Sequence, residues 1–149
     1  MTNVVCAATG FLLAVLWFDL MFDVQVRPHV GAELPAEVRS SISSYYARVT
    51  TGAAPRSKLV VVAMLAVVVG IIGELINGEP EFWRAFMSLI FSIAAVGLAK
   101  WRTVPNAVRI GRNEDDPATQ SALIRLVYAD HRSSFSFIVT VLALHIVRF

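Results

Sequence analysis

The sequence predicts an all-α membrane protein, built as a bundle of four transmembrane helices with an amphipathic interfacial helix in the first connection. Hydrophobic residues make up 56% of the chain and charged residues 16%, where soluble domains carry about 25% charged residues. Four hydrophobic segments, at roughly 4–26, 58–77, 82–101 and 133–147, approach or reach the length of about 20 residues that a helix needs to cross a bilayer. With 149 residues, we expect a single transmembrane domain, 1–149.

The first segment, roughly 4–26, carries two acids near its end, Asp19 and Asp23. Because they are four residues apart, they share one face of a helix. A carboxylate inside a membrane helix is costly and needs a proton, water or a partner. The partners that we expect at the matching depth are Arg102, Arg109, His131 and Arg132.

The connection that follows, 27–57, contains a helical pattern between Pro35 and Thr50. Its apolar residues recur every three or four positions, and Arg39 and Arg48 lie elsewhere on the turn. This pattern predicts a helix on the membrane surface, with two tyrosines at headgroup level. The apolar positions are Val38, Ile42, Tyr45 and Val49, and the tyrosines are Tyr45 and Tyr46.

The second and third helices are predicted at 58–77 and 82–111, joined by a tight turn over 77–81. The third carries a stripe of small residues that favours close packing between membrane helices. Continued at the same spacing, this stripe becomes polar, and Pro105 predicts a kink within it. The small residues are Ala85, Ser88, Ser92, Ala95 and Ala99, and the polar continuation is Arg102, Asn106 and Arg109.

The fourth helix is predicted over 117–147, because Asp116 followed by Pro117 is typical of a helix start. Ser133, Ser136, Thr140 and Ala143 form a second stripe of small residues, with Asp130 near its polar end. At the opposite end of the bundle Glu74 and His145 form a candidate pair. The alternative, which we favour, is that Glu74 reaches water.

Lysine and arginine predict the orientation, since they concentrate in cytoplasmic loops. None precedes residue 27, five lie in 27–58, one lies in 59–99, six lie in 100–132 and one follows at 148. The two basic segments therefore share a side. We expect both termini outside and both long connections in the cytoplasm. The basic residues lie beside apolar segments and not in a basic block, so we expect a lipid bilayer as partner and no nucleic acid.

The predicted cytoplasmic cluster has two interpretations: an ion-paired lock between helices, or a site for a substrate, a proton or a metal. Carboxylate and imidazole groups from Asp19, Asp23, Asp130 and His131 suit a divalent metal. The nearby arginines argue against a cation, so we expect no metal, and no motif indicates a cofactor. The cluster comprises Asp19, Asp23, Arg102, Asn106, Arg109, Asp130, His131 and Arg132.

Two stretches carry a family resemblance: Val104-Pro105-Asn106-Ala107-Val108-Arg109, and Asp130-His131-Arg132 after a charged helix. Their layout resembles the anthrone-oxygenase-like family of small four-helix membrane proteins. The resemblance implies a four-helix membrane fold and raises an oxygenase reaction as a hypothesis. We carry over no catalytic residue from that family.

Three functions remain open at this point, and the sequence does not decide whether the protein is an enzyme. The first is a non-enzymatic accessory or assembly subunit that binds a membrane protein partner or a second copy. The second is a membrane oxidoreductase or oxygenase for a lipophilic aromatic or quinone-like substrate. In it Asp19, Asp23 and His131 act as acid and base, and Arg102 and Arg109 orient oxygen atoms. The third is proton-coupled transport, because paired carboxylates in a membrane can relay protons.

Overall fold

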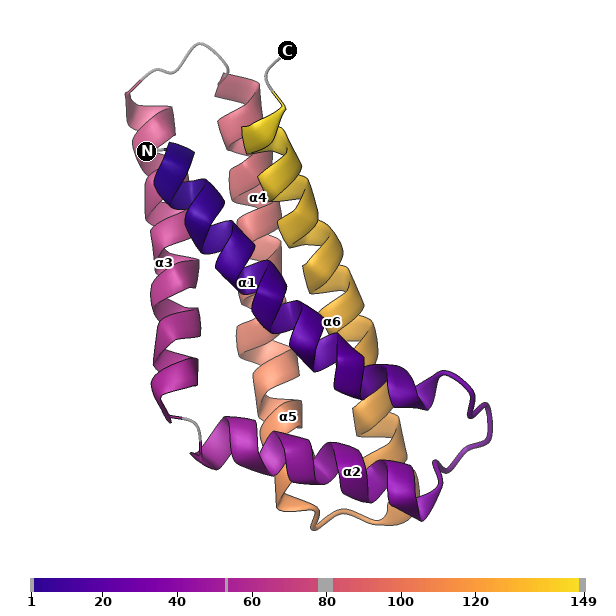
Figure 1. Ribbon diagram of the computed structural model, residues 1–149. Coiled ribbons are helices and arrows are strands. Elements are labelled where there is room, and N and C mark those ends of the chain that lie inside the picture. Colours follow the sequence, from indigo (N-terminus) through magenta and orange to yellow (C-terminus); the bar gives the residue numbers. More distant parts are fainter. Residues whose placement is uncertain (1, 53, 78–81, 148–149) are drawn as a thin grey trace.

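The computed structural model describes residues 2–52, 54–77 and 82–147, and all regular structure in these residues is helical (Figure 1). The long helices α1, α3, α4 and α6 run along the bundle, and α2 lies across one end of it beside α5. The helices are α1 (Thr2–Asp23), α2 (Ala36–Ala47), α3 (Ala54–Ile76), α4 (Phe82–Leu98), α5 (Val104–Arg112) and α6 (Pro117–Ile146). The shorter turns are the 3₁₀ turn η1 (Val24–Val26) and the π-helical turns η2 (Arg48–Gly52) and η3 (Ala99–Thr103).

In the part of the chain that the structure describes, three helical segments are long and apolar enough to cross a membrane: Thr2–Val26, Ser57–Ile76 and Phe82–Arg112. Their outward faces carry exposed large apolar side chains, among them Phe18, Val62 and Ile93. Contiguous apolar surface of this kind is rare on soluble monomers. These observations indicate a membrane protein. The turn predicted over 77–81 falls almost wholly outside the described residues.

The core of the bundle depends on small residues that let the helices approach closely. Ala85, Ser88, Ser92 and Ala95 of α4 are all buried, so the predicted inward face of this helix is confirmed. On α3, a Cβ added at Gly70 would come within 2.6 Å of the Val5 side chain. Glycine is therefore required where α3 crosses α1.

The predicted small-residue stripe of α6 is wrong. Ser133 and Ser136 are exposed, and the buried positions are Ser134, Ile138 and Val141. The outward serines donate to the carbonyl four residues earlier in the same helix, at 3.1 Å each. Because a hydroxyl can satisfy itself in this way, it does not have to face a neighbouring helix.

A second apolar core lies at the α2 end and joins α2 to α5 and α6. Ile42 and Tyr46 of α2 pack there with Ile110 and Ile124. A Cβ added at Gly111 would lie 2.8 Å from a backbone nitrogen of α2, so the two helices touch through their backbones. The apolar face predicted for the connecting helix therefore covers other helices of the protein. The remaining buried members are Val26, Leu34, Ala107 and Val127.

The long helix predicted over 82–111 is present as a continuous run of α4, η3 and α5. The irregularity starts at Ala99, before Pro105, and takes the form of the π-helical turn η3. Pro105 lacks an N–H, and its ring crowds the carbonyl of Trp101, so the turn before it widens. The predicted start of α6 is confirmed, since the Asp116 carboxylate accepts from the backbone N–H groups of Ala118 and Thr119.

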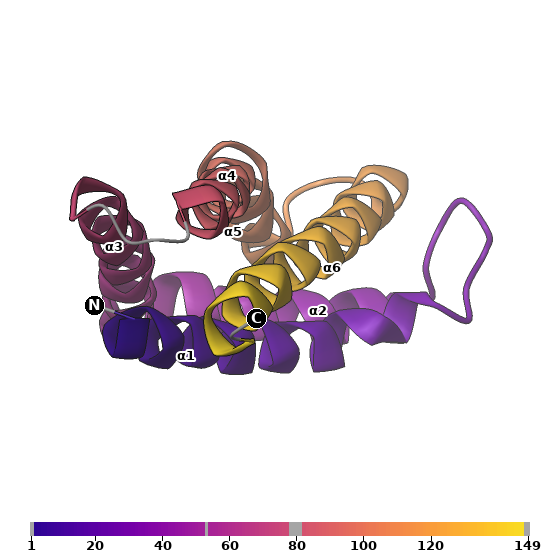
Figure 2. The ribbon, with the colours of Figure 1, turned by 90° about the horizontal axis from the view of Figure 1, so that it is seen from above.

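The arrangement seen from above places α1 along one side of the bundle and α3 and α4 on the other (Figure 2). Both chain termini lie at the end opposite α2 (Figure 1). One end of the molecule therefore holds α2, α5 and the first turns of α6, where most of the basic residues are found.

Candidate functional site

A cavity of about 250 Å³ lies inside the bundle and is closed at one end by α2 and α5; we call it the chamber. Its walls come from α1, α3, α4 and α6 and are mainly aliphatic, with Leu12, Val67 and Ile138 as examples. Small ligands typically bind in apolar pockets that offer a few polar groups. The polar side chains that line the chamber are Asp19, Tyr46, Thr50, Ser57, Ser92, Thr103, His131 and Ser134.

At the α2 end, three buried side chains from three helices form a hydrogen-bonded trio. Tyr46 donates to Asp23 Oδ1 at 2.7 Å, and His131 Nδ1 lies 2.6 Å from Asp23 Oδ2. The exposed fractions are 0% for Asp23, 2% for Tyr46 and 7% for His131. Tyr46 and His131 line the chamber and Asp23 lies behind them. We refer to these residues as the Asp–His–Tyr trio.

The contact between Asp23 and His131 fits a proton on Nδ1 of the imidazole, because a carboxylate accepts hydrogen bonds. In a neutral imidazole the other nitrogen, Nε2, is then an acceptor. His131 lines the chamber together with Tyr46. Burial, followed by the charge of Asp23, raises the pKa of Tyr46 well above its usual value, so this phenol remains a donor.

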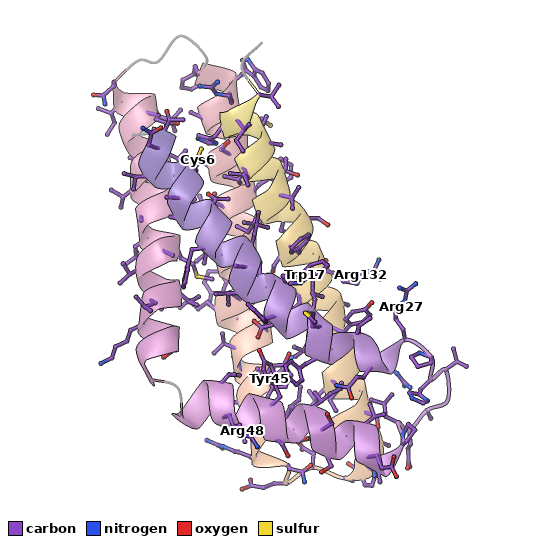
Figure 3. All side chains as sticks on the ribbon, in the orientation of Figure 1. Cys6, Trp17, Arg27, Tyr45, Arg48 and Arg132 are labelled. Carbon is purple, nitrogen blue, oxygen red and sulfur yellow. The ribbon has the colours of Figure 1, made fainter. Side chains whose placement is uncertain are left out.

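The second acid of α1, Asp19, also faces α2. Tyr45 donates to Asp19 Oδ1, and Asp19 lines the chamber. The Tyr45 ring stacks on Phe22 with 4.0 Å between centroids and meets Tyr46 edge-on at 5.4 Å. Figure 3 shows Tyr45 between the lower end of α1 and α2. Both tyrosines of α2 thus donate to acids of α1.

Arg102, one of the cations expected to meet the acids of α1, is paired with Asp130. Arg102 Nε donates to Asp130 Oδ2 at 2.9 Å, and its terminal nitrogen contacts Oδ1. Thr103 donates to the same carboxylate at 3.2 Å. The Asp130 side chain is fully buried and the Arg102 side chain is half exposed. This bidentate pair joins η3 to α6.

Other residues predicted for the cluster lie elsewhere. Arg109 pairs with Asp115 at 2.6 Å on the surface. Arg132 is exposed and lies over the Tyr128 ring, on the outer side of the bundle (Figure 3). Asn106 is half-buried on α5. The expectation that Arg102, Arg109 and Arg132 meet the two acids of α1 is therefore wrong, and of the expected partners it is His131 that contacts Asp23.

For Asn106 and Arg109 the physical reason is the π-helical turn η3, which shifts the helical register of α5. The predicted inward positions on this continuation were 102, 106 and 109, whereas Thr103, Ala107 and Ile110 are the buried ones. A π turn inserts one extra residue, so the following helix is rotated by one position. Asn106 and Arg109 therefore lie off the inward face.

At the other end of the bundle, Glu74 and His145 are buried and lie 3.1 Å apart. Thr2 donates to Glu74 Oε1 at 3.0 Å, and His145 Nδ1 lies 2.8 Å from the Val141 carbonyl. The favoured expectation that Glu74 reaches water is wrong. The partners on α1 and α6 replace the water that the carboxylate would otherwise need.

The described side chains of the site offer hydrogen-bond donors and acceptors. Within residues 2–52, 54–77 and 82–147, no three His, Cys, Asp or Glu side chains are grouped as a metal ion requires. Sequence reasoning missed Tyr45, Tyr46 and Ser92 as parts of the site. The available signal was a pair of adjacent tyrosines in a chain whose first helix carries two acids that need hydrogen-bond donors.

Comparison with protein-family models, curated proteins and solved structures finds no match to this chain.

Proposed function

We propose that the protein crosses the membrane four times, with both termini outside and α2 at the cytoplasmic interface. α6 packs along α1 and α4 through the length of the bundle, so it shares their depth (Figure 1). The end that holds α2 and α5 is the basic end, which the positive-inside rule assigns to the cytoplasm. Reporter fusions after Gly31, Asn113 and the C-terminus test this topology. An external signal from Gly31 or Asn113 would contradict it.

We further propose that the chamber binds a small lipophilic molecule and that the Asp–His–Tyr trio exchanges a proton with its oxygen-bearing end. The observation that supports this most is that apolar walls end at His131, whose Nδ1 is held by a buried carboxylate. An imidazole backed by a carboxylate is a common general base. The reaction class that suits this arrangement is proton abstraction from a phenol or an enol.

Each member of the trio has a separate task in this proposal. His131 Nε2 accepts the proton, and the Asp23 carboxylate stabilises the imidazolium that forms. Tyr46 holds Asp23 in place through its hydrogen bond at 2.7 Å. Asp19, at the chamber wall, disfavours ligands that are anionic before the proton leaves. The resemblance to the anthrone-oxygenase-like family is a further reason to propose aromatic oxygen chemistry for this site.

An alkylated nitrophenol tests the proposal, because its absorbance distinguishes the phenol from the phenolate. At one pH we expect the bound probe to be more ionised in the wild type than in the Asp23→Asn and His131→Gln variants. Glu74→Gln is the matched control, since it alters a buried acid–histidine pair outside the chamber. Equal spectra in all four proteins would contradict proton exchange. Failure of the wild type to bind the probe would contradict the binding proposal itself.

A second candidate function is a structural or accessory subunit. It is favoured by the Arg102–Asp130 and Glu74–His145 pairs, which connect helices at both ends of the bundle. In this case the outer apolar faces would contact a partner protein or a second copy. Purification in a mild detergent separates the two candidates. A stable complex whose formation survives Asp23→Asn supports the subunit, and a monomer that binds the nitrophenol supports the chamber.

A further inference from the structure

We propose that the ligand of the chamber is a lipid with a small, neutral, oxygen-bearing ring as its head group, and that it enters sideways between α3 and α5. The ring occupies the chamber and the apolar tail stays in the bilayer. This inference rests on the proposed binding function and specifies its substrate class.

The chamber reaches the surface between α3 and the α4–α5 run. Ser57 on α3 and Val104 on α5 both line it and are both exposed, and Val60 and Val108 beside them are half-buried. On the far side α1 crosses the bundle (Figure 2). Val104, which lines the opening, is itself more than half exposed. The helical segments on its two sides, Ser57–Ile76 and Phe82–Arg112, are long and apolar enough to cross a membrane, so we infer that the opening between them faces acyl chains.

The size of the chamber decides how much of the ligand it holds. Its volume is about 250 Å³, and pockets for whole drug-sized ligands are typically about 300–1,000 Å³. A single ring with its substituents fits this space, but a ring with a long tail does not. The remainder of a lipid must therefore leave through the opening between α3 and α5.

The charges of the chamber exclude a phospholipid head group. Asp19 lines the wall and Asp23 lies behind Tyr46 and His131, so a phosphate would lie close to two carboxyl groups. The guanidinium of Arg102 is already paired in bidentate fashion with Asp130. A neutral hydroxyl or carbonyl group suits this environment, because it can donate to His131 or accept from a nearby hydroxyl.

Ser92 supplies a second polar contact in the wall. Its hydroxyl lines the chamber, the residue is 2% exposed, and its Oγ has no hydrogen-bond partner among the described residues. Buried hydroxyls in proteins are nearly always satisfied. An oxygen on the ring, away from the one at the trio, satisfies it. The ligand is thus a ring that carries two oxygens.

Two hydroquinones that differ only in the tail test this inference: one with a methyl and one with a decyl substituent. Binding is measured by calorimetry on the full chain in nanodiscs. Val104→Trp fills the opening, and Val62→Trp is the matched control on an exposed face of α3 that does not line the chamber. We expect Val104→Trp to weaken the decyl compound about tenfold and to leave the methyl compound nearly unchanged. Val62→Trp should change neither affinity.

The serine contact has its own matched pair. Ser92→Ala should weaken both hydroquinones by a similar factor of about five to ten, the loss expected for one hydrogen bond. Ser88→Ala removes an equally buried and unpartnered hydroxyl outside the chamber and should weaken neither. Equal effects of the two serine variants would contradict the proposed hydrogen bond between Ser92 and the ligand.

The remaining outcomes separate this inference from the function it rests on. If Val104→Trp leaves the decyl compound unaffected, or weakens both compounds equally, lateral binding of a tailed ligand is wrong. Binding of the methyl compound that still depends on His131 then preserves the proposed function. Displacement of the decyl compound by anionic phospholipid vesicles would also contradict the proposal that the head group is a neutral ring. If the wild type binds neither hydroquinone, both proposals fall.

Discussion

Removal of one hydroxyl group should weaken the attachment of α2 to α1. Tyr46→Phe keeps the ring in the apolar core but leaves Asp23 Oδ1 without the donor that now lies at 2.7 Å. Because Asp23 is fully buried, the loss of a hydrogen bond to this charged group should cost about 1.5–3 kcal/mol. For a chain of this size that corresponds to a melting temperature lower by about 3–12 °C.

Thermal unfolding in detergent, followed by near-ultraviolet circular dichroism, measures this cost. Tyr128→Phe is the matched control, since Tyr128 is half-buried on α6 and its ring, which contacts Arg132, is retained. Its melting temperature should change by less than about 2 °C, as is usual away from buried partners. In an Asp23→Ala background, Tyr46→Phe should have little further effect. The same loss in both backgrounds would refute the assigned hydrogen bond.

The same tyrosine predicts how stability depends on pH. Burial raises the pKa of Tyr46 in the folded protein, whereas an unfolded tyrosine ionises near about pH 10. Above that pH the unfolded chain releases a proton that the folded protein keeps, which favours unfolding. The contribution of Tyr46 is therefore complete below about pH 10 and is lost as the pH rises toward the folded pKa. The melting temperature of Tyr46→Phe should fall less steeply above about pH 10 than that of the wild type, and parallel curves would contradict this.

Three further predictions concern a buried charge at the α2 end and two helical glycines. Arg102→Ala leaves the fully buried Asp130 with only a hydroxyl donor, so it should lower the melting temperature more than Arg109→Ala, which breaks an exposed pair; equal losses would contradict this. Gly111→Ala places a methyl group 2.8 Å from the α2 backbone and should destabilise the protein by about 1–3 kcal/mol in denaturant unfolding. Gly10→Ala, with nothing within 4 Å of its added Cβ, should instead stabilise α1 by up to about 1 kcal/mol.

The features that could be predicted from the sequence are those that depend on one helix at a time. Length and hydropathy alone identify the apolar segments, because crossing a bilayer requires a minimum length. The inward face of α4 follows from the spacing of Ala85, Ser88 and Ser92, since small residues recur only where helices approach closely. The start of α6 is equally local, because Asp116 caps the helix that it precedes.

Predictions that extrapolate through an irregular turn fail. The inward face of α4 does not continue to Asn106 and Arg109, because η3 adds a residue and brings Ala107 and Ile110 inward instead. The serine stripe of α6 fails for another reason: a hydroxyl satisfied within its own helix carries no information about its neighbours. Spacing alone shows neither effect.

The choice of partners for the acids of α1 shows where matching opposite charges by depth is misleading. A buried guanidinium must lose its hydration, and this cost can exceed the attraction to a carboxylate. A phenol is neutral, loses less on burial and still donates a hydrogen bond. Asp19 and Asp23 accordingly take Tyr45 and Tyr46 as donors, while Arg102, which pairs with Asp130, keeps half of its side chain exposed.

This selection of partners has a consequence for chemistry. A carboxylate locked to an arginine is held in its ionised form, whereas one bound by a phenol and an imidazole belongs to a network that can rearrange its protons. Asp23 is bound in the second way, and the imidazole that it orients lines the chamber. If proton exchange depends on this neutral network, Tyr46→Arg, which substitutes a cation for the phenol, should abolish ionisation of the nitrophenol probe even if the protein folds. If this variant folds and still ionises the probe, the neutral donor is not needed for proton exchange.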